Sequence, residues 1–235
     1  MLFVKSINII SFKTAYWIYP IFKSFDSDNA FMVIVIHHIM QAFIAFSIIC
    51  GISLLCKIKI KEFGFNFNQF GVSIKLVLIF TGIWTIIQTI GGIIIVKIMH
   101  IPSAFTFPLN IKNFIGYFLF EILLSGTSEE IVFRALVITS VLYIWKNLFL
   151  KQRNLYICAV LVSTMIFMFD HINFSYLPLR ITYINYLQQI TVFIFGIFYG
   201  YLMVKTKSIV GSIFAHNLLN GVITIIGFIL LNKRV

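Results

Sequence analysis

The sequence Ser128-Glu129-Glu130-Ile131-Val132-Phe133-Arg134 lies inside a long apolar run that extends from Phe114 to Trp145. Only Glu121 and the step Gly126-Thr127-Ser128 interrupt this run before the two glutamates. The chain has seven acidic residues, and two of them stand side by side in this segment. An ionised carboxylate is costly in hydrocarbon unless it is paired or solvated by protein. The run therefore indicates a membrane helix, and its adjacent glutamates mark a candidate functional site.

The composition is that of a membrane protein. Of the 235 residues 60% are hydrophobic and only 11% are charged, and the mean hydropathy is +1.02. A soluble domain would be about a quarter charged. The chain contains several runs of the length that a membrane span needs, and they lack the period-two alternation of barrel strands. The sequence therefore predicts an all-α fold, a polytopic transmembrane bundle of about six to eight helices.

The net charge of +11 arises largely from short basic loops. These loops comprise residues 57–61, 146–153 and 205–207, each of which lies between two apolar runs. Lys and Arg are retained on the cytoplasmic side of membrane proteins, so the charge predicts topology rather than nucleic-acid binding. If all three loops are cytoplasmic, segment 113–145 crosses the membrane once and the terminal Lys233-Arg234 lies outside.

The chain divides into apolar segments separated by polar turns. The expected spans are residues 30–56, 70–99, 113–145, 154–171, 183–204 and 208–231. Residues 1–22 are expected to form an interfacial helix or a poor first span, and residues 172–182 a loop. At about 1.5 Å per residue, segment 113–145 reaches roughly 50 Å, against a hydrocarbon core of about 30 Å. We therefore expect a strong tilt, or a break near Gly126 with Ser128 as the helix N-cap.

Polar clusters interrupt the C-terminal spans at three places: Glu129-Glu130 with Arg134, Phe167 with His171, and His216 with Asn220. Glu130 and Arg134 are four residues apart, so they share a helix face and can pair. Glu129 points about 100° away and can face another helix. The partners available to Glu129 are therefore the polar residues of the later spans.

A depth estimate tests whether these clusters can meet. Counted from the basic loop at 146–153, Glu129 and His171 both lie roughly 25 Å along their helices. His216 lies only about 13 Å from the loop at 205–207. Glu129 and His171 are therefore expected at similar depths in the membrane. His216 reaches the same depth if its helix is tilted or shorter, or if the loop before it is offset.

Two hydrolytic mechanisms fit these residue types. A glutamate in an apolar pocket can act as the general base for a water, while histidine and asparagine donors bind a developing oxyanion. Alternatively, Glu129, His171 and His216 form a ligand set for a catalytic zinc ion with an open position. The residues alone leave both mechanisms open.

The three clusters, in this order, resemble the CAAX protease and bacteriocin-processing family of intramembrane proteases, also called the Abi family. The likeness covers roughly residues 113–225. Its pattern is Glu-Glu-x-x-x-Arg, Phe-x-x-x-His and His-x-x-x-Asn, which here reads Glu129-Glu130-Ile-Val-Phe-Arg134, Phe167-Met-Phe-Asp-His171 and His216-Asn-Leu-Leu-Asn220. Many relatives have glycine after the arginine, and here this residue is Ala135, which is also small.

The resemblance implies a role for each motif residue. Glu129 would be the base and His171 would position the water. His216 and Asn220 would bind the oxyanion or, with Glu129 and His171, a metal such as zinc. The remaining pair, Glu130 and Arg134, would brace the site.

The resemblance also implies an endopeptidase that acts on a peptide or membrane-protein substrate within the lipid bilayer. Bacterial branches of the family are linked to peptide maturation, bacteriocin processing and immunity, and the Ile, Phe, Lys and Asn enrichment of AT-rich codons favours a bacterial plasma membrane. The alternative is a non-catalytic immunity or regulatory protein that binds another membrane protein. A small transporter with a carboxylate proton relay is a third interpretation.

Structural interpretations exist for the same residues. Glu130 and Arg134 can be a purely structural ion pair, and His216 with Asn220 can be interhelical hydrogen-bonding contacts. Adjacent residues such as His37 and His38 point in different directions on a helix, so they are not expected to chelate a metal together.

A single integral membrane domain is predicted. Residues 1–69 would form its N-terminal helices and a cytoplasmic loop, and residues 70–235 its catalytic core with all three motifs. Within this core, Glu121 lies two turns before Glu129, where it can line the same cavity.

Overall fold

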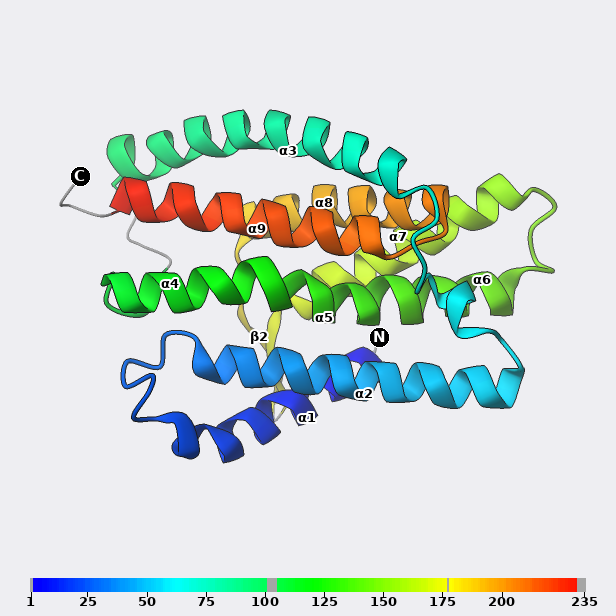
Figure 1. The fold of residues 1–235 in the computed structure, drawn as a ribbon, viewed down its shortest axis with the longest axis horizontal. Coiled ribbons are helices and arrows are strands. Elements are labelled where there is room, and N and C mark those ends of the chain that lie inside the picture. The colour runs from blue at the N-terminus through cyan, green and yellow to red at the C-terminus, as the bar shows by residue number, and fades with distance from the viewer. Residues whose placement is uncertain (1, 101–104, 177, 232–235) are drawn as a thin grey trace.

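The computed structural model describes residues 2–100, 105–176 and 178–231, which form a bundle of seven continuous helices (Figure 1). The predicted all-α fold is confirmed. Six of the helices have simple bounds: α1 (Leu2–Ile18), α2 (Met32–Cys56), α3 (Phe70–Ile93), α7 (Gln152–Asp170), α8 (Tyr186–Thr206) and α9 (Val210–Leu231). Short extensions adjoin α1 (η1, Tyr19–Phe22) and α3 (η3, Ile94–Ile98), and a turn of helix lies between α2 and α3 (η2, Ile60–Phe63).

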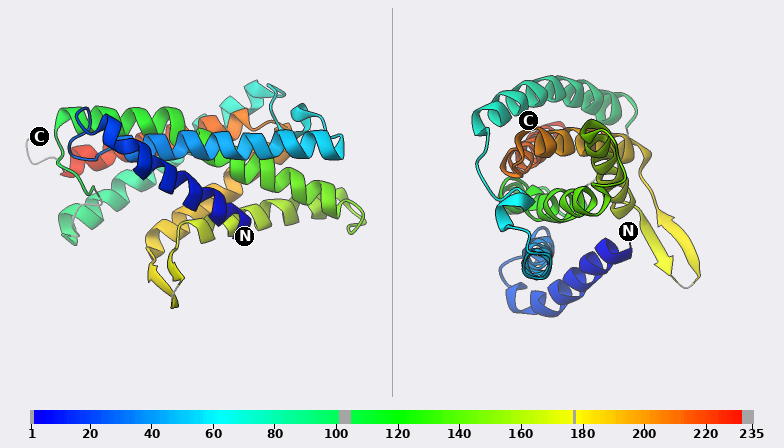
Figure 2. Two further views of the ribbon diagram at one scale, coloured as in Figure 1. Left: turned by 90° about the horizontal axis from the view of Figure 1, so that it is seen from below. Right: turned by 90° about the vertical axis from the view of Figure 1, so that its right-hand side faces the viewer.

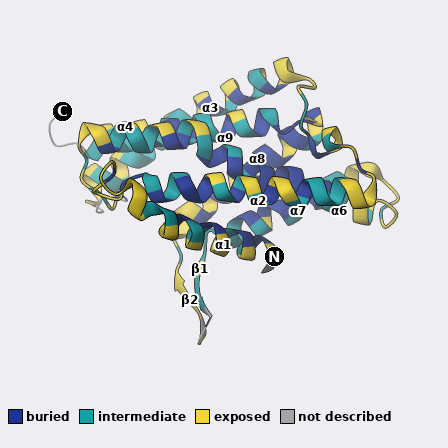
Figure 3. Ribbon diagram, turned by 60° about the horizontal axis from the view of Figure 1, so that its bottom comes forward, coloured by how far each residue is buried: buried dark blue, intermediate teal, exposed yellow. Residues whose placement is uncertain are grey.

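Within the described residues, five helices are long and apolar enough to cross a membrane: α2, α3 with η3, α7, α8 and α9. Together with the composition they define an integral membrane protein. α3 and α1 lie on opposite outer sides of the bundle, as the end-on view shows (Figure 2). Dark, buried faces turn toward the centre and yellow, exposed faces turn outward (Figure 3).

The central helix consists of α4 (Ile111–Phe120), η4 (Glu121–Ser125), α5 (Gly126–Glu130), η5 (Ile131–Ile138) and α6 (Thr139–Trp145). It is unbroken, so the predicted break near Gly126 is wrong, and so is the N-cap role of Ser128. The glycine serves close packing instead, because an added Cβ at Gly126 would lie 2.5 Å from the Cβ of His216 on α9. The wider π turns of η4 and η5 flank α5, and such turns are frequent at functional sites.

The most buried part of the bundle surrounds this helix. All eight residues of η5 are buried. On the neighbouring helix pair, Gly196 and Gly200 of α8 face α7, where an added Cβ would lie 2.7 Å from Thr164 or Val160 side-chain atoms. Glycines four apart allow two helix backbones to approach closely in a membrane. α7, α8 and the central helix are thereby held together around the motif residues.

A β-hairpin replaces the loop predicted at residues 172–182. β1 (Asn173–Tyr176) pairs antiparallel with β2 (Leu179–Tyr183), with Phe174 opposite Ile181 and Ser175 opposite Arg180. The hairpin projects from the bundle (Figure 2). Aromatic and β-branched residues such as those of Ile181-Thr182-Tyr183 favour extended structure, which the loop prediction overlooked.

The basic loops that follow α2, α6 and α8 lie at one end of the bundle (Figure 1). The first and last are in contact, since the Asn66 Nδ2 donates to the Lys207 carbonyl oxygen at 2.8 Å and the Ile209 N–H donates to the Gly64 oxygen at 3.0 Å. The predicted alternation of spans therefore fits the fold. The cytoplasmic side of that end stays a prediction, and Lys233-Arg234 lies outside the described residues.

Candidate active site

The motif glutamates lie on α5, between α9 and α2 (Figure 1). Glu130 pairs with Arg134 as the sequence predicts, with Oε2 3.1 Å from the arginine Nε, and both side chains are fully buried. The Arg134 Nη1 also donates to the Ser163 Oγ at 3.3 Å. The guanidinium lies 4.9 Å from the Phe167 ring centre and 5.5 Å from that of Tyr199. Aromatic faces of this kind attract a cation, so Arg134 is held from several sides.

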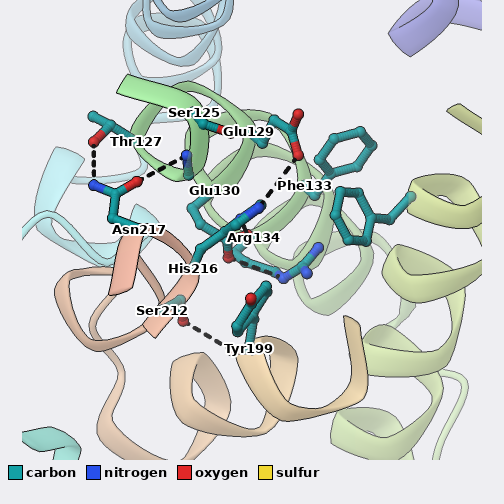
Figure 4. Close-up of polar contacts among 12 residues, drawn as sticks. Ser125, Thr127, Glu129, Glu130, Phe133, Arg134, Tyr199, Ser212, His216 and Asn217 are labelled. Carbon is teal, nitrogen blue, oxygen red and sulfur yellow. Dashed lines mark hydrogen bonds and ion pairs between the residues drawn. The ribbon is translucent and has the colours of Figure 1, made fainter. Parts of the chain in front are cut away.

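His216 of α9 lies between the two glutamates (Figure 4). Its Nδ1 is 2.9 Å from the Glu130 Oε1, and its Nε2 is 3.7 Å from the Glu129 Oε2. A carboxylate paired with arginine only accepts hydrogen bonds, so Nδ1 is the donor. The ring also stacks on Tyr199 with centroids 4.8 Å apart. Glu130 and Tyr199 thus fix the imidazole so that Nε2 faces Glu129.

The two glutamates differ in accessibility. The Glu130 side chain is 0% exposed, whereas that of Glu129 is 17% exposed. Among the described residues, the recorded polar partner of the Glu129 carboxylate is His216. The sequence predicts different partners for the two glutamates, and their geometry differs accordingly: Glu130 is held in the ion pair, and Glu129 keeps an accessible carboxylate.

His171 follows the last residue of α7 and lies near the cluster without a recorded contact to Glu129. Its Nδ1 is 2.9 Å from the Phe167 carbonyl oxygen, so Nδ1 donates and Nε2 is left as an acceptor. The Phe167 ring meets the His171 ring edge-on at 4.7 Å and the His216 ring at 5.9 Å. One aromatic ring therefore packs against both motif histidines.

The structure places Asn220 one turn beyond His216 and against other partners. Its Nδ2 donates to the Glu121 Oε2 at 2.9 Å and to the Ser125 Oγ at 3.0 Å. Glu121 meets Asn220, and its predicted place in the same cavity as Glu129 stays a prediction. No contact between Asn220 and Glu129 is recorded in the described part of the chain, so the oxyanion role of Asn220 stays a prediction.

Asn217 has a role that the motif reading missed. Its Oδ1 accepts from the Gly126 N–H at 2.8 Å, and its Nδ2 donates to the Thr127 Oγ1 at 3.2 Å (Figure 4). These bonds join α9 to the start of α5. The sequence signal was an amide directly after the motif histidine, in a span where unpaired polar groups are costly.

Two further polar residues come from α2, which the motifs do not include. His38 Nδ1 lies 2.5 Å from the Ser128 Oγ, and this hydroxyl also reaches the Gln41 Oε1 at 3.0 Å. The neighbouring His37 instead stacks on Phe12 of α1 with centroids 3.7 Å apart. The two histidines point in different directions, as expected. A His-x-x-Gln pair on one face of an apolar span was the signal in the sequence.

The predicted zinc set of Glu129, His171 and His216 stays a prediction. Within the described residues, no three His, Cys, Asp or Glu side chains are grouped so that they could hold a metal ion. The bond from the His216 Nδ1 to Glu130 leaves Nε2 as the nitrogen that could bind a metal. Because no such group of three ligands is present among the described residues, we derive no step through a metal.

The fold and site together define an integral membrane bundle with a buried Glu-His-Glu cluster on its central helix. Residues 111–222, just under half of the chain, match the family model described as Type II CAAX prenyl endopeptidase Rce1-like, which agrees with the resemblance that the motifs indicate. No curated protein and no solved structure matches the chain. The matched segment begins at α4 and ends within α9, so it includes all three motifs, whereas α1, α2 and α3 lie outside it. The similarity is therefore to endopeptidases of the CAAX type.

Proposed function

We propose that this protein is an intramembrane endopeptidase in which Glu129 activates the water that hydrolyses a peptide bond. The observation that carries the proposal is the position of His216, which binds Glu130 through one nitrogen and faces Glu129 with the other. A purely structural ion pair would need only Glu130 and Arg134. The second, partly accessible glutamate beside an oriented imidazole is the arrangement that general base catalysis requires.

In the proposed reaction, Glu129 accepts a proton from a water while the water oxygen attacks the carbonyl carbon of the scissile bond. The tetrahedral oxyanion accepts hydrogen bonds from the Nε2–H of a doubly protonated His216 and from Asn220, which exchanges one of its bonds to Glu121 or Ser125 for the oxyanion. His171 orients the water through its Nε2 lone pair. Glu129 then returns its proton to the amine as the C–N bond breaks. The products are a carboxylic acid and an amine, so the water atoms are fully accounted for. Arg134 and Glu130 hold His216 in place throughout.

The proposed substrate is a peptide or membrane-protein segment that enters from the lipid bilayer. A prenylated peptide is the substrate type named by the family description. The enrichment in Ile, Phe, Lys and Asn, which AT-rich codons encode, favours a bacterial plasma membrane. In that setting the proposed role is the maturation or processing of bacterial peptides. A zinc-assisted route is the competing proposal, and metal analysis of the mildly purified protein would distinguish the two.

The decisive experiment compares the peptides of cells that express the wild type with those of cells that express Glu129→Ala. A substrate accumulates uncleaved only in the variant, and a fluorogenic copy of its cleaved segment becomes the reporter peptide. We expect Glu129→Ala and His171→Ala to abolish cleavage of the reporter peptide, while Glu62→Ala, in the exposed loop after α2, retains it. Glu62 is a matched control because it is an acidic residue remote in sequence from the motifs.

Full cleavage by the folded, inserted Glu129→Ala protein would overturn the proposal. If a cellular phenotype also survived substitution of all four residues Glu129, His171, His216 and Asn220, a non-catalytic immunity or regulatory protein would be the better description. Substrate flux that depends on Glu129 without cleavage would instead favour a transporter.

A further inference from the structure

Helix α2 lies outside the matched segment, yet it contacts the motif helix directly. Its residues Gln41, Ala45 and Ile49 are all buried and recur at the spacing of one helix face. His38, three residues before Gln41, continues this face and is 8% exposed. Two polar side chains therefore lie at one end of an otherwise apolar contact surface. Such residues are retained in membrane helices when they have a partner or a function.

The partner is Ser128, which is 2% exposed. Its Oγ lies 2.5 Å from the His38 Nδ1 and 3.0 Å from the Gln41 Oε1. A serine hydroxyl carries one proton, and an amide oxygen only accepts. The hydroxyl also lies 3.2 Å from the Ser125 carbonyl oxygen, so its one proton is shared between two groups that only accept, and His38 donates from Nδ1 to Ser128. The result is a directed chain of hydrogen bonds from α2 to α5.

This chain ends at the residue that precedes Glu129. Rotation of α5 about its axis would move the Ser128 hydroxyl away from His38 and would turn the Glu129 carboxylate away from the His216 Nε2. The His38 ring is itself held edge-on against Phe120 of α4, with centroids 4.8 Å apart.

We propose that His38 is a positioning residue for peptide-bond cleavage: with Gln41 it holds Ser128, and this contact sets the direction of Glu129 relative to His216. The inference rests on the proposed function and extends it, because it makes α2 a part of the catalytic arrangement. A histidine that only fills space in the core would tolerate any side chain of similar volume. A positioning histidine requires the donor at its Nδ1.

Two substitutions at His38 separate these roles. In His38→Asn the amide nitrogen stands at the place of Nδ1 and can still donate to Ser128, whereas in His38→Gln the amide group extends to the place of Nε2. His37→Gln is the comparison at the neighbouring position: His37 is buried and stacks on Phe12 of α1, and its ring meets the His38 ring edge-on at 4.9 Å but has no bond to Ser128 among those the structure shows. Each variant is measured for kcat and KM on the reporter peptide and for its thermal unfolding temperature.

We expect His38→Gln to lower kcat by about 10- to 100-fold with little change in KM, as a displacement of about 1 Å at a catalytic group would. His38→Asn should stay within about threefold of the wild type, since the donor that holds Ser128 is kept. His37→Gln should stay within about twofold, because it leaves the chain to Ser128 intact.

If His38→Gln does not fold, Ser128→Ala removes the same hydrogen bond and is expected to lower kcat to a similar extent. The double variant His38→Asn/Ser128→Ala should then lose no more than Ser128→Ala alone, because both act through one contact. An unchanged kcat in folded His38→Gln, or in Ser128→Ala, overturns the inference about His38. If Glu129→Ala is inactive in the same assay, the proposed function still stands. An active Glu129→Ala overturns the proposed function itself, and the inference with it.

Discussion

The close approach of α9 to α5 at Gly126 is the contact on which the Glu-His-Glu cluster depends. A Cβ at Gly126 would lie 2.5 Å from the His216 Cβ and 2.6 Å from the Asn217 Oδ1, and ordinary contact begins at 3.4 Å. Neither atom is the far end of a long flexible chain. We therefore expect Gly126→Ala to push α9 away from α5 by about 0.9 Å, which is the difference between the clashing and the ordinary distance.

The size of the effect follows from this displacement. The hydrogen bond from the His216 Nδ1 to the Glu130 Oε1 would lengthen from 2.9 Å to about 3.8 Å, which is beyond hydrogen-bond range. A hydrogen bond to a charged group contributes about 1.5–3 kcal/mol, and each 1.4 kcal/mol or so in the barrier is tenfold in rate. We expect kcat on the reporter peptide to fall by about 100-fold, and stability to fall by about 1–3 kcal/mol from the overpacking.

Steady-state cleavage of the reporter peptide and thermal unfolding of the same preparation test this expectation. Gly82→Ala in α3 is the matched control, since an added Cβ there meets nothing within 4 Å. This control should keep the wild-type rate and unfold at the same temperature or slightly higher, because alanine favours a helix over glycine by about 1 kcal/mol. A folded Gly126→Ala protein with the wild-type kcat would refute the reasoning, because the site would then tolerate separation of the two helices.

Two other substitutions test the contacts that support the site. Arg134→Met removes one partner of a fully buried ion pair, so it should destabilise the protein by about 3–5 kcal/mol in denaturant unfolding, and Glu130→Gln/Arg134→Met should recover part of that loss. A single variant as stable as the wild type would contradict this. Lys5→Met removes the 3.2 Å ion pair with Asp170 and the hydrogen bonds from Lys5 to the Asp170 and Ile172 carbonyl oxygens, all of which join α1 to the end of α7. It should cost about 1.5–3 kcal/mol and speed protease cleavage within α1. Unchanged protease sensitivity would show that this pair does not hold α1 in place.

Contacts between residues close in sequence were the ones that the sequence could predict. The pairing of Glu130 with Arg134 follows from their spacing of four residues, and the structure shows it at 3.1 Å. The apolar segments likewise located the helices, because a membrane span leaves a long uninterrupted signal. The hairpin at 173–183 was missed because its short strands leave only a weak sequence signal. The continuity of the central helix was missed because a glycine inside a span can mark either a break or a close contact.

The depth of each residue along its helix limited which side chains could meet between helices, but it did not identify the pairs that do. The estimate left His216 roughly 13 Å from its loop and Glu129 roughly 25 Å from its own, yet the two side chains meet at 3.7 Å. The reason is an offset of the loops: α6 extends farther toward that end of the bundle than the turn between α8 and α9 does (Figure 1). The turn is set back where Asn66 and Gly64 bind it. A depth counted from each loop therefore misleads when the loops end at different heights.

The same reasoning explains why His38 could not be placed from the sequence. No motif spacing connects α2 to α5, and they are 90 residues apart at their polar contact. What the sequence did contain was a histidine and a glutamine on one face of an apolar span, and these groups require partners in a membrane. A buried polar residue in a membrane span requires a partner, and the partner of His38 is Ser128, the residue that precedes Glu129. On the proposed positioning role, His38→Gln should therefore lower kcat, whereas His37→Gln should leave it within about twofold of the wild type.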